Sequence, residues 1–380
     1  MKEIGFLRGV PAEEALEAVA GIVEEGYARA LREYGAKLLQ YQIPGLSDFN
    51  GFMPLKKTLA DRYGIGGDPN RRVICFNGGL EALSMILKAF LKGSRIAMEA
   101  LTYDRALADA IRYEHEVAGI PLSKEGVDLD AMEKTLSAGN IKLFYRVIYH
   151  QNPTGLDSTP QNIEDAARLC ARYNTLYVCD IAYYELRYDG LKNRLPDLDA
   201  NPTTCLIGSF TKTLSPGTKC GFGIFPETLV DRLAPVIANT RLNPNYPTQA
   251  MIHNVIASGE YDQYLGYLAG LYRSRMEALN GSLVQYLDGI EVPRVTGGFF
   301  AGLWLPGIGN EEDFVKAAKA NAVNIATANV FCPGWKTALR EKQQGSFFRL
   351  TFPSVSPEEI EQGIERIGKT YKEKRLSATL

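Results

Sequence analysis

The chain has 380 residues, 46% of them hydrophobic, and its 42 basic and 44 acidic side chains leave a formal net charge of −2. A chain of this length and composition buries a sizeable core and is expected to form two or three domains. The balanced charge excludes the basic bias that is typical of nucleic-acid-binding proteins, so we expect no nucleic-acid partner.

No apolar run approaches the roughly 18 residues that a membrane span requires, and the first residues, MKEIGFLRGVPAEEAL, lack the apolar core of a signal peptide. The six cysteines form no C-x-x-C pair, and none of the three histidines is spaced as a ligand pair. We therefore expect reduced thiols, no metal site, no membrane partner and a cytoplasmic location.

Predicted strands and helices alternate over the first two thirds of the chain. A short arm and an amphipathic helix at residues 13–35 come first. Strands are predicted at 71–79, 94–101, 115–122, 142–150, 175–182 and 203–210, and helices at 80–93 and 102–113. This alternation implies crossover connections and a largely parallel sheet that is covered on both faces.

The pattern changes after about residue 260. A long helix is predicted at 260–287, two strands around a Gly-Gly pair at 292–306, a helix at 311–323, a strand at 346–352 and a final helix from Ser356, which suits its N-cap. We expect an N-terminal arm and helix (1–44) that pack with a small α+β domain (261–380), and a large α/β domain (45–260) between them.

Polar residues follow several predicted strands at the point where each strand ends. In open parallel sheets, ligands bind beyond the carboxyl ends of the strands, so these residues are candidates for a site. Asn77, Gly78 and Gly79 precede a helix, where free backbone amides attract a phosphate group. The same Gly-Gly pair is also typical of an ordinary strand–helix turn.

Asn152 and Asp180 follow two further strands. Asn152 lies in the segment QNPTG, which forms either an ordinary turn or one that points its amide into the crevice. Asp180 ends a buried strand and needs a partner, because an unpaired buried charge is costly. It either caps a helix or accepts a hydrogen bond from a protonated ring nitrogen, with the hydroxyl of Tyr183 donating to a ring oxygen.

Lys212 follows the strand at 203–210 and is surrounded by the hydroxyl residues Ser209, Thr211 and Ser215. A lysine at this place forms a Schiff base if burial or a cationic neighbour lowers the pKa of its amine, and Lys219 supplies such a charge while also meeting a phosphate. The alternative is an ordinary surface lysine on a turn.

Taken in order, these features resemble the pyridoxal-phosphate enzymes of fold type I, in particular the class I/II aminotransferases and the group that contains 2-aminoadipate aminotransferases. The resemblance covers most of the chain and is carried by NGGLEAL, EALTY, QNPTG, DIAYYEL, SFTKTLSPG and FFRLTFPSVSPEEIEQGI. It implies a large domain with a mainly parallel seven-stranded sheet flanked by helices, a smaller α+β domain, pyridoxal 5′-phosphate as cofactor and a homodimer.

The resemblance also implies a role for each catalytic residue. Lys212 holds the cofactor as an internal aldimine and then acts as general base and acid at the substrate α-carbon. Asp180 keeps the pyridine nitrogen protonated, which makes the ring an electron sink. Asn152 and Tyr183 bind the 3′-oxygen of the ring.

The remaining roles concern the phosphate, the ring face and the substrate. The resemblance implies that Arg349, together with Asn152, binds the substrate carboxylate, because the planar guanidinium matches a carboxylate. Tyr103 stacks on the cofactor ring. The implied phosphate contacts come from Gly78, Gly79, Leu80, Ser209, Lys219 and the partner subunit's Tyr41.

The function that the resemblance implies is exchange of an amino group between an α-amino acid and a 2-oxo acid. Two alternatives stay open from the sequence. The same cofactor and lysine support elimination, replacement, oxidation or carbon–carbon bond formation. A non-enzymatic regulator that retains the fold is the other alternative, although the sequence has no basic stripe or DNA-binding extension.

Overall fold

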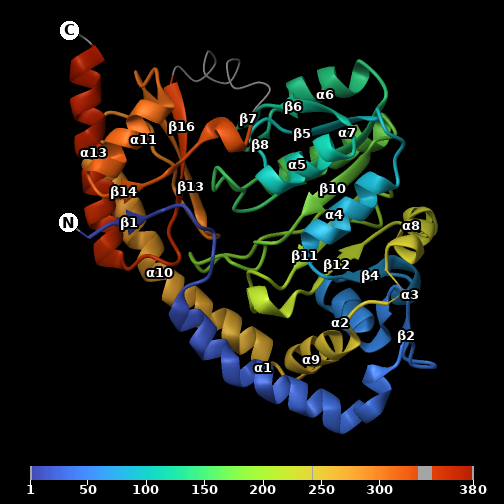
Figure 1. The fold of residues 1–380 in the computed structure, drawn as a ribbon. Coiled ribbons are helices and arrows are strands. Elements are labelled where there is room, and N and C mark those ends of the chain that lie inside the picture. The colour runs from blue at the N-terminus through green and yellow to red at the C-terminus, as the bar shows by residue number, and fades with distance from the viewer. Residues whose placement is uncertain (1, 242, 333–344, 379–380) are drawn as a thin grey trace.

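The computed structural model describes residues 2–241, 243–332 and 345–378. In Figure 1 the large sheet lies on the right, a small sheet with helices α11 (Glu311–Ala320) and α13 (Pro357–Ala378) lies on the left, and the long helices α1 (Glu13–Tyr34) and α10 (Glu260–Tyr286) run below both. The two termini lie on the side of the small sheet.

The large sheet has seven strands in the order β4-β12-β11-β10-β9-β5-β6. All neighbours pair in parallel except β12, which is antiparallel to both β4 and β11. The strands are β4 (Val73–Phe76), β12 (Gly221–Ile224), β11 (Thr204–Ser209), β10 (Leu176–Asp180), β9 (Ile141–Val147), β5 (Arg95–Glu99) and β6 (Glu116–Ile120). The predicted mainly parallel seven-stranded sheet is thereby confirmed.

Strands buried on both faces explain why the sequence shows apolar runs rather than alternation. In β9 every residue except Lys142 is buried, and β4 and β12 are buried along their whole length. The helices of this part of the chain are α2 (Met53–Tyr63), α3 (Pro69–Arg72), α4 (Gly79–Lys88), α5 (Asp104–Arg112), α6 (Leu129–Ser137), α7 (Pro160–Arg172), α8 (Glu227–Thr240) and α9 (Tyr246–Ala257). Short strand pairs are β2 (Ser47–Asp48) with β3 (Gly51–Phe52), and β7 (Leu122–Ser123) with β8 (Gly126–Val127).

The C-terminal third forms a small antiparallel sheet in the order β13-β16-β15, with β13 at Phe300–Pro306, β16 at Gly345–Thr351 and β15 at Ala326–Thr327. The last helix begins at the predicted N-cap, Ser356, with a capping box: the Ser356 N–H donates to Glu359 Oε2 at 3.3 Å, and the Glu359 N–H donates to Ser356 Oγ at 3.3 Å.

The N-terminal arm lies along the small sheet. Strand β1 (Ile4–Gly5) pairs in parallel with β14 (Val323–Asn324), and the Thr351 N–H donates to the Phe6 carbonyl at 3.0 Å. Helix α1 then packs on α9 and, to a lesser extent, on α10. This path carries residues 7–10 across the region between the two sheets.

One predicted element differs from the structure. Two strands were expected around the Gly-Gly pair at 292–306, but only Phe300–Pro306 forms a strand. Gly297 makes a single bridge to Arg187, and Gly298 has a φ of +64°. The chain turns there because the pair packs against the ring and backbone of His150, which leaves no space for a Cβ.

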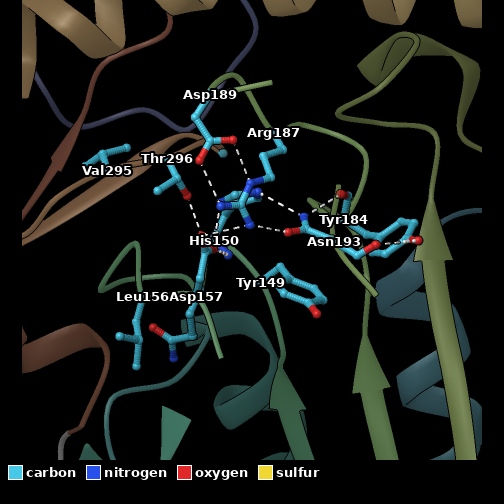
Figure 2. A network of polar contacts seen from close by, with 12 residues as sticks. Tyr149, His150, Leu156, Asp157, Tyr184, Arg187, Asp189, Asn193, Val295 and Thr296 are labelled. Atoms are coloured by element: carbon cyan, nitrogen blue, oxygen red, sulfur yellow. Dashed lines mark hydrogen bonds and ion pairs between the residues drawn. The ribbon is translucent and has the colours of Figure 1, made fainter. Parts of the chain in front are cut away.

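A polar network fixes this turn to the large sheet (Figure 2). His150 Nδ1 lies 2.8 Å from Asp157 Oδ1, and the Thr296 hydroxyl donates to the other carboxylate oxygen. Burial alone would raise the pKa of Asp157, but His150 and Thr296 lower it to about 2. Arg187 adds an ion pair to Asp157 at 3.7 Å and a hydrogen bond to Asn193 Oδ1 at 2.8 Å.

All six cysteines are buried, and no disulfide joins any two of them. In the described part of the chain, no helix is both long and apolar enough to span a membrane.

Candidate active site

Asp180 is the last residue of β10, and its carboxylate is buried. Its Oδ2 accepts a hydrogen bond from the Tyr145 hydroxyl at 2.8 Å, and its Oδ1 accepts one from the Ala182 N–H at 2.9 Å. Burial raises the pKa of Asp180 to about 6, although both hydrogen bonds act in the opposite direction. No helix begins in the described segment between β10 and β11, so Asp180 is not a helix cap.

Lys212 lies in the turn after β11, with its amine directed inward. Its Nζ donates to the Gly9 carbonyl at 2.6 Å and lies 5.5 Å from the ring centre of Phe299. Burial, and then the positive charges of Arg349 and Lys219, lower the pKa of Lys212 to about 8. This environment is not that of an ordinary surface lysine.

Arg349 comes from the central strand of the small sheet and reaches the large sheet. Its Nη1 donates to Asn152 Oδ1 at 3.0 Å, and its Nη2 donates to the Leu7 carbonyl at 2.9 Å. Burial lowers the pKa of this guanidinium. Asn152, which follows β9, is thereby joined to the arginine that the resemblance assigns to the substrate carboxylate.

Two tyrosines complete the group. Tyr183 is buried and packs edge-on against Phe299 and Phe300, with ring centres 5.7 Å and 5.5 Å away. Tyr103 directly precedes α5, and burial, with the charges of Asp104 and Asp180, raises its pKa to about 12. Six predicted residues therefore converge on one site from different strands. Asp180 ends β10 and Arg349 lies in β16, whereas the other four follow strands: Lys212 follows β11, Asn152 follows β9, Tyr183 follows β10 and Tyr103 follows β5.

The glycine turn after β4 lies beside Ser209. Gly78 has a φ of +133°, and a Cβ on Gly79 would lie 3.6 Å from the Cβ of Ser209. The N–H groups of Gly79 and Leu80 lie in the first turn of α4, where no intrahelical acceptor exists. Lys219 is exposed, with a φ of +47°, and its charge reaches Lys212. The start of α4 therefore combines free backbone amides with the neighbouring Ser209 side chain.

Tyr41 lies apart from the other predicted residues. Its side chain is 74% exposed, so it does not belong to the core of its own chain.

Sequence reasoning missed a buried cluster beneath Asn152. Gln151 Nε2 donates to Glu99 Oε2 at 2.9 Å and to the Leu101 carbonyl at 2.6 Å, while Gln151 Oε1 accepts from the Thr154 N–H at 3.0 Å and from its hydroxyl. The peptide between Asn152 and Pro153 is cis. Burial raises the pKa of Glu99 to about 7, opposed by Arg146 at 3.7 Å.

A second unpredicted network supports the lysine turn from below. The Tyr261 hydroxyl lies 2.6 Å from Thr213 Oγ1 and 2.7 Å from Glu185 Oε2. Arg62 donates from Nε to Glu185 Oε1 at 2.7 Å. A single tyrosine in a long helix gives no sequence signal for such a role, because its helical spacing already predicts burial.

The arrangement fits a cofactor with an aldehyde, a pyridine ring and a phosphate. The lysine amine has a lowered pKa, a carboxylate ends a central strand, and free backbone amides lie at the start of α4. Among the described residues no group of three or more metal-ligating side chains comes together.

Residues 27–367 match the family model described as aminotransferase class I and II. The chain belongs to this family. It is 28% identical over 387 aligned positions to an aromatic-amino-acid aminotransferase of Thermococcus litoralis, covering 97% of this chain and 88% of that protein. It is 27% identical to a 2-aminoadipate transaminase of Thermus thermophilus, covering 97% of this chain and 90% of the relative.

Among solved structures, the fold superposes with a TM-score of 0.84 on the α-aminoadipate aminotransferase LysN of Thermus thermophilus in complex with N-(5′-phosphopyridoxyl)-L-leucine, at 26% identity. That match covers 99% of this chain and 93% of the other. The predicted family, fold, enzyme class and cofactor are confirmed: the protein is a pyridoxal-phosphate-dependent aminotransferase of fold type I.

Proposed function

We propose that the amino group passes between an α-amino acid and a 2-oxo acid at the site formed by Lys212, Asp180, Asn152, Tyr183 and Arg349. The observation that carries this proposal is the buried amine of Lys212, whose pKa of about 8 makes the free base available close to neutral pH. Such an amine acts both as the attachment point of the cofactor and as the base that moves a proton.

When bound, pyridoxal phosphate supplies an electron sink for the negative charge that develops at the substrate α-carbon. The Lys212 amine would serve as the base that takes the proton from the substrate α-carbon and as the acid that gives it back. Asp180 would accept a hydrogen bond from the ring nitrogen, and the Tyr145 hydroxyl holds this carboxylate in place. Asn152 and Tyr183 would bind the ring oxygen, and Tyr103 would cover the ring.

Arg349 binds the substrate carboxylate, with Asn152 beside it. Its Nε is buried and has no hydrogen-bond acceptor among the described residues, so one edge of the guanidinium keeps an unused donor. A carboxylate that bridges two guanidinium nitrogens satisfies this donor. The carbonyl of Leu7, which accepts from Nη2, gives way to the stronger charged acceptor.

The residues at the start of α4 would hold the phosphate group. Gly78 shapes the turn, the amides of Gly79 and Leu80 donate, and Ser209 and Lys219 add a hydroxyl and a charge. The proposal includes a homodimer in which the partner subunit's Tyr41 contacts the same phosphate. Three exposed apolar side chains along one stretch, Leu31, Leu39 and Tyr41, support an interface there.

Subunit complementation tests the shared site. K212A and Y41A chains are each expected to form inactive dimers. After mixing and subunit exchange, mixed dimers regain one intact site, since the lysine comes from one chain and the tyrosine from the other. Activity that does not rise above that of the two separate variants contradicts the shared site.

A spectral screen of amino acids against the cofactor-loaded protein tests the reaction. Transamination converts the bound cofactor to its pyridoxamine form, and a 2-oxo acid then reverses the change. Elimination or replacement regenerates the aldehyde form instead. The names of the relatives make aromatic amino acids, 2-aminoadipate and leucine the first donors to test.

We also propose the domain limits 1–44, 45–260 and 261–380. The gap between α9 and α10 at residues 258–259, and the separate small sheet that follows, support the second limit.

A further inference from the structure

The guanidinium of Arg349 contacts two aromatic rings. Its central carbon lies 4.8 Å from the ring centre of Phe300 and 4.6 Å from that of Phe331. Both rings are almost completely buried. Phe300 belongs to β13, whereas Phe331 follows the short helix η3 (Ala328–Val330), so the two rings approach the guanidinium from different segments of the chain.

These rings restrict where the guanidinium can go. A cation beside an aromatic face is held by the ring quadrupole, and burial strengthens this attraction. With the rings alongside it, Arg349 uses its in-plane N–H groups for Asn152 and Leu7 and keeps Nε unused. The rings thus remove water from the guanidinium and fix the plane in which a carboxylate can be bound.

Phe331 is itself held by contacts that do not involve Arg349. Its ring packs in a small apolar cluster with Leu101, Ala328, Cys332 and Phe347. Its carbonyl accepts a hydrogen bond at 3.3 Å from the N–H of Thr102, the residue before Tyr103. The position of Phe331 is therefore set by the segment between β5 and α5 of the large domain as well as by the small sheet.

We propose that Phe331 is a positioning residue for recognition of the substrate carboxylate: its ring holds Arg349 in the plane in which the guanidinium binds the carboxylate. The inference rests on the proposed role of Arg349. Phe300 contributes a ring too, but it also packs on Tyr183, so only Phe331 allows the effect on Arg349 to be isolated. Sequence reasoning gives no signal for Phe331, since nothing in its neighbourhood distinguishes it from a core residue.

The test compares amino acids with amines that lack the carboxylate. The change in visible absorbance of the cofactor-loaded protein gives dissociation constants for L-phenylalanine and phenethylamine, and for L-leucine and 3-methylbutylamine. Replacement of Phe331 by Leu or Met keeps an apolar side chain and removes the ring. Both variants are expected to weaken amino-acid binding about 3- to 30-fold and to leave amine binding unchanged. F331Y keeps the ring and is expected to bind like the wild type.

F347L is the matched control, because Phe347 lies in the same buried cluster and its ring packs on Trp304 at 5.3 Å. F347L is expected to leave the ratio of the dissociation constants for amino acid and amine unchanged. R349L lacks the guanidinium and is the reference for a protein that no longer binds the amino acid more tightly than the amine.

The inference is overturned if F331L and F331M bind amino acids as tightly as the wild type, or if they weaken both classes of probe equally, which is the result of a merely structural role. A wild-type protein that holds the cofactor but discriminates no better than R349L contradicts the proposed role of Arg349, and this inference falls with it. If the wild type binds amino acids more tightly than amines and the Phe331 variants have the same dissociation constants as the wild type, only this inference is overturned.

Discussion

At the scale of single residues, the lowered pKa of the buried Lys212 amine gives a prediction that can be measured directly. Its amine loses charge near pH 8, so the rate at which it captures an aldehyde is expected to rise with pH through this range. Lys219 disfavours the charged amine, and K219Q removes that effect. The variant should therefore need a higher pH for the same capture rate.

Stopped-flow absorbance with pyridoxal as the aldehyde measures this shift. Pyridoxal has no phosphate, so a lost phosphate contact does not complicate the comparison. A K219Q profile that coincides with the wild-type profile, or moves to lower pH, contradicts the assigned charge coupling.

Asp180 is expected to destabilise the cofactor-free protein at neutral pH. Its pKa is about 6 in the folded chain and 3.8 when unperturbed, so the folded state binds more protons between these values. Stability therefore falls as pH rises from about 4 to 6, and D180N removes the penalty. The variant should gain about 2–3 kcal/mol in free energy of unfolding at pH 8 and little at pH 4.

Denaturant unfolding of the cofactor-free proteins at both pH values checks this gain. Equal differences between D180N and wild type at pH 4 and pH 8 would show that Asp180 is not the group that titrates.

The site residues at the ends of strands were predictable from the sequence. The residues that hold them in place were not. Lys212, Asp180 and Asn152 stand where a parallel sheet exposes polar groups, and the sequence shows this directly. Tyr145 and Phe331 lie within apolar runs, where an aromatic residue is expected for packing alone. Their roles depend on partners far away in sequence, such as Asp180 and Arg349.

Helix α10 contributes a structural support at the scale of elements. The Tyr261 hydroxyl joins this helix to Thr213, the residue after Lys212, and to Glu185, which also binds Arg62 of α2. Y261F leaves buried polar groups without a partner, so we expect a loss of about 1–3 kcal/mol in free energy of unfolding. Cofactor binding should weaken as well, because the lysine turn loses a fixed contact.

Chemical denaturation and cofactor titration of Y261F measure both effects. Y267F, in the same helix but 43% exposed, is the control and should stay within about 0.5 kcal/mol of the wild type. Equal stability of the two variants would contradict a supporting role for Tyr261.

Strands and helices were predictable where the sequence follows a regular pattern. They were not predictable where a glycine is required by close packing against a residue far away in sequence. The strands at β4, β5, β9, β10 and β11 follow from apolar runs bounded by turn residues. Strand β12 was not predicted, because the sequence GFGI contains two glycines. Gly221 is required there, since a Cβ would lie 2.5 Å from the backbone of Gly78.

At the scale of the whole molecule, the two sheets meet at a closely packed junction. A Cβ on Gly297 would lie 2.2 Å from the Leu186 carbonyl and 2.5 Å from the ring of His150, the residue at the centre of Figure 2. A backbone carbonyl in a buried turn cannot move away cheaply. We expect G297A to cost about 2–3 kcal/mol in free energy of unfolding.

Thermal unfolding compares G297A with G281A, which lies in α10 and has no atom within 4 Å of the added methyl group. G281A should be as stable as the wild type or more stable by about 0.5–1 kcal/mol. If G297A were as stable as G281A, the close packing described for this junction would be contradicted.

The organisation of the molecule was predictable mainly through its ordered motifs. Alternating strands and helices indicate a parallel sheet, but strand order and the antiparallel β12 depend on contacts that no local pattern encodes. The meeting of Arg349 with Asn152 joins residues 197 positions apart. Resemblance to a family predicted that meeting; periodicity did not.

Reduction of the cofactor-loaded protein with borohydride, followed by peptide mass mapping, tests the central claim most directly. The account predicts that the reduced cofactor is attached to Lys212 and that K212A carries no adduct. An adduct on another lysine, or none in the wild type, would contradict the assignment of the site.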